Sequence, residues 1–152
     1  MTDNKYTAYC GLCCSHCYSR THIAPTAEKL KEQMKAQGFE SFGPYMQDYT
    51  EFWRFISTLT EAEGCPGCRQ GGGNPACAMR DCAQGKQTEA CPLCSEYPCD
   101  KFDWLNTSEA YPMLESDNAL MQELGTEAWE MMQKERRDKG FTYVEERKKY
   151  KE

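Results

Sequence analysis

Cysteine is the residue that most constrains how this chain can fold, because 11 of the 152 residues are cysteine. An early cluster reads Cys10-x3-Cys14-x2-Cys17, and residues 65–99 then hold Cys65-x2-Cys68, Cys77-x4-Cys82, Cys91-x2-Cys94 and Cys99. Two cysteines separated by two residues can reach one tetrahedral metal ion from a single tight turn. The spacing therefore predicts metal-binding loops.

The rest of the sequence places the chain in a reducing compartment. No stretch approaches the roughly 18 consecutive apolar residues that a membrane span needs, and the start lacks the apolar core of a signal peptide. We therefore expect a soluble, cytoplasmic protein without a membrane partner. Because the cytosol is reducing and the cysteine count is odd, metal or redox chemistry is favoured over disulfides.

Charge argues against nucleic acid as a partner. The formal net charge is −6, and none of the segments 1–64, 65–99 and 100–152 is basic. Zinc modules that bind nucleic acid usually present a positive face to the phosphates. Each site of four thiolates and one Zn²⁺ would add a further −2. A protein partner of unknown identity is the better expectation.

Helical periodicity surrounds the cysteine clusters. A helix is expected from Pro25-Thr26 to Gly38, and a second one runs on from Pro44. The second helix carries one apolar stripe, which we expect to form the main hydrophobic wall of the core: Tyr45, Tyr49, Phe52, Ile56 and Leu59. Two further helices should meet at Gly125-Thr126 and end at Gly140.

The expected architecture is a small single domain over residues 1–152. It is mainly α, with irregular cysteine-rich loops that metal ions hold together. Its parts are the first cysteine cluster (9–22), helices (26–60), cysteine-rich loops (64–99) and C-terminal helices (107–140).

Ten cysteines have positions that suit metal ligation: Cys10, Cys14, Cys17, Cys65, Cys68, Cys77, Cys82, Cys91, Cys94 and Cys99. A closed structural zinc site takes four thiolates at about 2.3 Å, so these residues would serve about two ions. Their partition between sites is open. One arrangement would pair the Cys65/Cys68 turn with Cys91/Cys94.

Iron–sulfur ligation remains an alternative to zinc, since thiolates hold both. The spacing of the first cluster also resembles the radical S-adenosylmethionine motif, but the strand–helix series of that fold is missing from the sequence. Redox dithiols at the C-x-x-C turns lack the preceding strand that they need. His16 could replace a cysteine as ligand, whereas Cys13, next to Cys14, is better read as a buried or free thiol.

The ordered elements Tyr9-Cys10-Gly11-Leu12, Gly64-Cys65-Pro66-Gly67-Cys68, Asp81-Cys82-Ala83 and Cys91-Pro92-Leu93-Cys94-Ser95-Glu96-Tyr97-Pro98-Cys99 resemble a known family. It is a cysteine-rich family of prokaryotic domains of unknown function that is commonly described as zinc-binding. The resemblance runs from about Tyr9 to Phe102 and implies the same ten ligands. Cys13 departs from it, because members usually carry another residue there.

The sequence thus favours a zinc-binding protein of unknown biological role, in which the metal is structural and the domain serves as a binding or scaffold module. It contains no H-E-x-x-H motif and no H-x-E followed by P-C-x-x-C, which zinc hydrolases and deaminases use. An enzymatic role is therefore open but not favoured. The alternative is an iron–sulfur or thiol-based redox enzyme or sensor.

Overall fold

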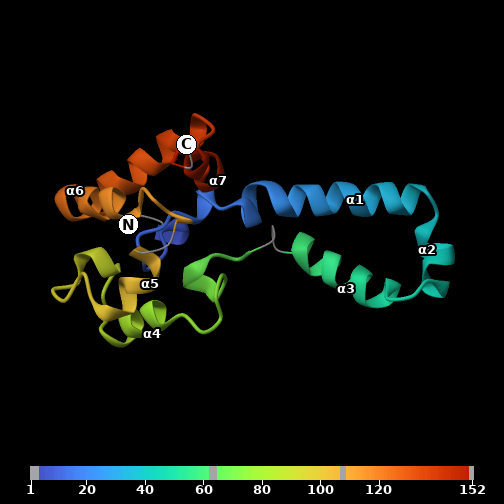
Figure 1. Ribbon diagram of the computed structural model, residues 1–152, viewed down its shortest axis with the longest axis horizontal. Helices are drawn as coiled ribbons and strands as arrows, with labels where there is room; N and C mark the ends of the chain where they lie inside the picture. The colour runs from blue at the N-terminus through green and yellow to red at the C-terminus, as the bar shows by residue number, and fades with distance from the viewer. Residues whose placement is uncertain (1–3, 62–64, 107–108, 151–152) are drawn as a thin grey trace. The chain divides into compact units, whose positions relative to one another are not determined.

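The computed structural model describes residues 4–61, 65–106 and 109–150 (Figure 1). Helices dominate these ranges, which hold no β-strand and only an isolated bridge between Thr7 and Cys13. The mainly α fold class is confirmed. None of the described helices is both long and apolar enough to cross a membrane.

The chain divides into two compact units. The first, here called the cysteine-rich unit, comprises Met1–Cys17 and Gly67–Glu152. The second, the helical hairpin, comprises Tyr18–Pro66. The single zinc-binding domain over 1–152 stays a prediction.

The helical hairpin follows the periodicity of its sequence. A π-helical turn (Ser19–Ile23) leads into α1 (Ala24–Ala36), which therefore begins before the expected Pro25-Thr26 start. Gly38 follows with φ of 88°, a left-handed conformation that suits glycine at a helix end. The short α2 (Phe39–Phe42) and a 3-10 turn (Gly43–Tyr45) then connect to α3 (Tyr49–Thr60).

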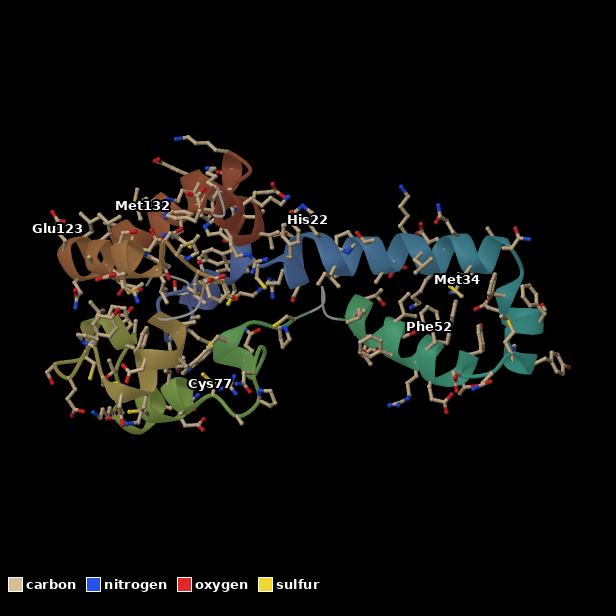
Figure 2. All side chains as sticks on the ribbon, viewed as in Figure 1. His22, Met34, Phe52, Cys77, Glu123 and Met132 are labelled. Atoms are coloured by element: carbon tan, nitrogen blue, oxygen red, sulfur yellow. The ribbon has the colours of Figure 1, made fainter. Side chains whose placement is uncertain are left out.

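The apolar stripe of α3 does not form the main hydrophobic wall that the sequence led us to expect. Ile56 is its only fully buried member, and Tyr45, which lies before the helix, is 90% exposed. Met34 and Phe52 point from α1 and α3 into the space between them (Figure 2). Two helices cover only one side of each other, so Phe52 stays exposed and Tyr49 and Leu59 are only half-buried.

The cysteine-rich unit combines short turns with four α-helices. Its helices are α4 (Ala78–Gly85), α5 (Asp103–Asn106), α6 (Leu114–Asp138) and α7 (Tyr143–Lys148). The 3-10 turns are Asn4–Tyr6, Cys14–His16, Cys68–Gln70, Cys91–Leu93 and Asp100–Phe102. The loops expected over 64–99 thus contain a helix, α4, and residue 64 lies outside the described residues, as do 107 and 108 of the expected C-terminal helices.

Gly125 interrupts α6, as the sequence predicts. Its φ of 75° and ψ of 168° are not helical, so two helical segments meet there. After Gly140, Thr142 caps α7 by accepting a hydrogen bond from the backbone N–H of Glu145 at 3.2 Å. This cap stabilises a helix beyond Gly140, where the expected C-terminal helices end.

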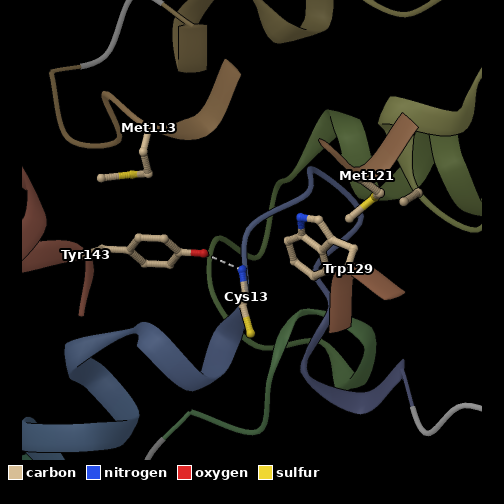
Figure 3. Close-up of a cluster of buried hydrophobic side chains, with 6 residues drawn as sticks. Cys13, Met113, Met121, Trp129 and Tyr143 are labelled. Atoms are coloured by element: carbon tan, nitrogen blue, oxygen red, sulfur yellow. Dashed lines mark hydrogen bonds between the residues drawn. The ribbon is translucent and has the colours of Figure 1, made fainter. Parts of the chain in front are cut away.

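The main core lies in the cysteine-rich unit (Figure 3). Trp129 of α6 is fully buried, and its Nε1–H donates to the carbonyl of Asp117 at 3.0 Å. The hydroxyl of Tyr143 accepts a hydrogen bond from the backbone N–H of Cys13. The core thus packs the first cysteine cluster against α6 and α7. A second buried cluster consists of Met79, Phe102, Leu105 and Leu114.

Candidate metal centre

Four of the expected ligands line one pocket in the cysteine-rich unit: Cys82, Cys91, Cys94 and Cys99. Three short elements bring them there. Cys82 lies in α4, Cys91 opens a 3-10 turn and Cys99 immediately precedes another. The N–H of Cys94 donates to the carbonyl of Cys91 at 2.9 Å, which closes the tight turn expected of a C-x-x-C pair.

The pocket is small and has apolar walls. Its volume of about 30 Å³ has room for an ion or a water or two, not for an organic substrate. Met79, Ala83 and Phe102, which line it, are all buried. The pKa of Cys91 is raised to about 12, first by burial and then by the negative charges of neighbouring thiolates, of which that of Cys99 contributes most.

Two ion pairs stand beside these thiols. Lys86 Nζ lies 2.6 Å from a carboxylate oxygen of Glu96, and Lys101 Nζ lies 3.4 Å from Asp100. Both lysines line the pocket. The Glu96 hydrogen bond is the main cause of the raised pKa of Lys86, and nearby thiolates add to it. The lysine charges in turn favour the thiolate over the thiol.

A second group of thiols gathers around Cys10. The pKa of Cys10 is raised to about 12, first by burial and then by the charges of Cys68, Cys91 and Cys77, although a hydrogen bond with the backbone of Leu12 lowers it. Cys77 is the N-cap of α4 (Figure 2). Cys91 lies near both the pocket thiols and the Cys10 group. The charge of Cys99, from the pocket, and that of Cys77, from the Cys10 group, both raise its pKa.

Arg80 holds the loop between Cys68 and Cys77. Its guanidinium is buried and donates to the carbonyls of Gly72 at 2.9 Å, Asn74 at 2.9 Å and Pro75 at 3.0 Å. These three accepting carbonyls satisfy the buried cation. This glycine-rich loop is therefore a fixed connection between two expected ligands.

Asn118 of α6 fixes the loop that carries Cys10. Its fully buried amide donates to the carbonyl of Cys10 at 3.2 Å and to the hydroxyl of Tyr97 at 3.0 Å. Gly11 has φ of 85° and lies so close to Asn118 that a Cβ there would stand 1.8 Å from its Oδ1. The backbone N–H of Cys91 also donates to the carbonyl of Tyr9, at 2.6 Å.

The remaining expected ligands lie elsewhere. Cys14 opens the turn Cys14–His16 and Cys17 follows it. The pKa of Tyr111 is raised first by burial and then by the charges of Cys17, Cys10 and Cys14. Cys65 belongs to the helical hairpin, where its carbonyl accepts a hydrogen bond from Arg20. Within the cysteine-rich unit, the pocket brings Cys91 and Cys94 together with Cys82 and Cys99, and the pairing of Cys91/Cys94 with the Cys65/Cys68 turn stays untested.

His16 and Cys13 both lie in the core. The Nε2 atom of His16 is 2.9 Å from Oε1 of Gln133, and its ring meets Phe141 edge-on at 4.8 Å between centroids. Burial lowers the pKa of His16 and raises that of Cys13. Cys13 is 4% exposed and its Sγ lies 3.0 Å from the Ser15 hydroxyl. The reading of Cys13 as a buried thiol is confirmed.

The cysteine thiols of these two groups are chemically suited to bind a thiophilic metal. The cysteines of the two groups form no disulfide bond, and thiolates are the ligands that zinc and iron–sulfur clusters prefer. Within the described ranges, no three histidine, cysteine, aspartate or glutamate side chains are arranged to hold a metal ion. The match to a metal therefore rests on the chemistry of the thiols and on the pocket that four of them share, not on a preformed coordination geometry.

Sequence reasoning missed the residues that position the thiols. Arg80 and Asn118 act through contacts with distant backbone, and their hydrogen bonds have no local motif. The two pocket lysines are only weakly indicated by the sequence, through their closeness to expected ligands: Lys86 lies four residues after Cys82, and Lys101 lies two residues after Cys99. Neither spacing identifies a role without the fold.

Comparison with known proteins identifies a family for this chain. No curated protein and no solved structure matches the chain. One family model matches residues 6–104, which include all 11 cysteines and the Gly11 loop. The chain therefore belongs to the family described as "Protein of unknown function (DUF3795)".

Proposed function

We propose that this protein binds zinc through cysteine thiolates and that the metal is structural, so that the cysteine-rich unit serves as a binding or scaffold module. The observation that supports it best is the ion-sized pocket lined by four thiols, those of Cys82, Cys91, Cys94 and Cys99. A set of four thiolates is the donor set of a closed structural zinc site.

These residues suit a structural ion better than a catalytic one. A catalytic zinc keeps one position for water or substrate, which four protein ligands would fill. The pocket is also too small for an organic substrate. When bound, zinc would supply a fixed link between α4 and the two turns that follow it. Lys86 and Lys101 would offset part of the negative charge of the thiolates.

A second ion would use the group around Cys10. Cys10, Cys68 and Cys77 would supply three thiolates, and the fourth would come from Cys14 or Cys17 of the same unit. Arg80 and Asn118 keep the backbones of this group in place. About two zinc ions per chain would then connect most of the irregular segments of the unit.

The metal would contribute much of the stability of the unit. Structural zinc binds with about 10–16 kcal/mol of apparent free energy, whereas a whole domain is stable by about 5–15 kcal/mol. The function that remains is presentation of a surface to a protein partner. We place this non-enzymatic role in the cytoplasm, where the thiols stay reduced.

Elemental analysis of protein purified without oxygen tests the proposal, together with a visible spectrum. We expect about two zinc per chain and no absorbance near 400 nm. Cys94→Ser should remove one equivalent of zinc, and the matched control Cys13→Ala should keep both, because Cys13 contacts Ser15 and the core rather than the pocket. Protein that lacks zinc when purified and binds none when it is added refutes the proposal.

Stoichiometric iron with sulfide would replace zinc by an iron–sulfur cluster and favour the redox enzyme or sensor. The structure gives little support to a reactive surplus thiol. Cys13 is buried and its raised pKa keeps it a thiol near neutral pH, whereas reactive cysteines have a lowered pKa and some exposure.

A further inference from the structure

The helical hairpin exposes an unusual amount of apolar surface for its size. Twelve large hydrophobic side chains are exposed in the described residues, and seven of them belong to the hairpin: Ile23, Leu30, Phe42, Tyr45, Met46, Phe52 and Phe55. Scattered exposed hydrophobics are ordinary on a protein surface, but a contiguous group marks an interaction site.

Four of the seven are contiguous because they line one groove along α1 and α3. The groove has a volume of about 370 Å³, and its walls include Ile23 and Leu30 from the α1 side and Phe52 and Phe55 from α3. Ile56 forms part of its buried wall. We infer that a second copy of this chain covers the groove, so that two hairpins form a four-helix bundle. This inference is independent of zinc.

The shape of the face suits contact with itself. A two-fold interface needs one patch that carries both a projection and a hollow, since each copy offers the same surface. Phe55 projects at the edge of the groove and is 62% exposed. The groove beside it is large enough to receive one aromatic side chain from the partner copy. Each Phe55 would then fill the groove of the other copy.

The area is sufficient for a dimer. The four groove residues are 40–62% exposed, which leaves roughly 400 Å² of apolar surface per copy if a large apolar side chain has roughly 200 Å². Two copies would bury roughly 800 Å² of it. Because about 57% of a typical interface is apolar, this corresponds to roughly 1,400 Å² in total, within the standard range for specific complexes.

Charge also permits two copies to meet at this face. The chain as a whole carries −6, which opposes self-association. By contrast, α1 and α3 together carry three lysines and one arginine against three glutamates, a net charge of +1. The two helices are therefore close to neutral, and the described residues that line the groove carry no ammonium, guanidinium or carboxylate group. The groove therefore offers no electrostatic attraction for a strongly charged partner.

Sedimentation velocity of the metal-loaded full chain tests the inference. We expect the mass to rise from 17.5 kDa toward about 35 kDa, twice that value, as the concentration rises from about 1 to about 500 μM. Phe55→Asp should raise the dimer dissociation constant at least about tenfold. The matched control, Tyr45→Asp, changes a 90% exposed aromatic residue outside the groove and should leave the constant unchanged.

A photoreactive phenylalanine analogue at position 55 locates the contact. It should form a covalent dimer whose second attachment point lies in α1 or α3. A wild-type chain that remains a monomer at about 500 μM overturns the inference, and so does a dimer that Phe55→Asp leaves intact. A monomer that binds a hydrophobic dye, with binding lost in Phe55→Asp, would assign the groove to a different partner. Circular dichroism of each variant checks that it is folded.

Discussion

Gly11→Ala should be among the most destabilising single-methyl changes in this protein. Gly11 has φ of 85°, and the added Cβ would stand 1.8 Å from Oδ1 of Asn118. The left-handed conformation costs alanine about 1–2 kcal/mol. Overpacking against a fixed neighbour costs a further 1–3 kcal/mol or so. We therefore expect the free energy of unfolding of the cysteine-rich unit to fall by about 2–5 kcal/mol.

Asn118 has no low-cost way to move aside. It is fully buried, and its amide donates to the carbonyl of Cys10 and the hydroxyl of Tyr97. Rotating the side chain would break both hydrogen bonds and leave their partners unsatisfied, at about 1–3 kcal/mol each. The clash therefore displaces the Cys10 loop, or Asn118, or both.

Urea unfolding measures this cost. Tryptophan fluorescence in a Trp53→Phe background reports on the cysteine-rich unit alone, because only Trp104 and Trp129 then remain and both belong to it. Gly140→Ala is the matched control. Gly140 has φ of 80° with nothing within 4 Å of an added Cβ, so it should lose only the conformational part, about 1–2 kcal/mol.

A double-mutant cycle isolates the contact. In an Asn118→Ala background the clash is gone, so Gly11→Ala should then cost no more than Gly140→Ala does. Equal costs for the two glycine variants in the wild-type background would refute the reasoning. An undiminished cost of Gly11→Ala in the Asn118→Ala background would refute it equally.

Three further substitutions have expected outcomes. Arg136→Met leaves the buried carboxylate of Asp117, now 2.7 Å from the guanidinium, without its ion-pair partner and should cost about 3–5 kcal/mol in urea unfolding, less in Arg136→Lys. Thr142→Ala removes the cap of α7 and should cost about 1 kcal/mol, most of which Thr142→Ser should restore. Arg80→Met frees three carbonyls, so amide hydrogen exchange over residues 72–76 should accelerate while exchange in α6 stays unchanged.

Local patterns predicted the helices, and non-local contacts limited the rest. Gly38 and Gly125 end helical segments where the sequence places them, since a left-handed glycine is a local signal. α4 was missed because its one short apolar face, Met79 and Ala83, lies between glycine-rich and cysteine-rich stretches. α7 was missed although Thr142 and the glutamate three residues later form a recognisable cap.

The candidate site shows the same division. The C-x-x-C turn at Cys91 and Cys94 follows from spacing alone, because both thiols come from one turn. The association of that turn with Cys82 and Cys99 depends on how α4 packs, which no spacing encodes. Burial of the α3 stripe was overestimated for a related reason. Periodicity identifies an apolar face but does not say whether the same chain covers it.

The two proposals name a different source of stability for each unit, and the two sources can be tested separately. Zinc would stabilise the cysteine-rich unit by mass action, and self-association would stabilise the hairpin in a concentration-dependent manner. A chelator should therefore expose Trp129 while the dimer persists, whereas Phe55→Asp should abolish the dimer while Trp129 stays buried. Because the 39% of hydrophobic residues in this chain are divided between two small units, each unit would gain stability from a component outside its own side chains, a metal ion for one and a second copy for the other.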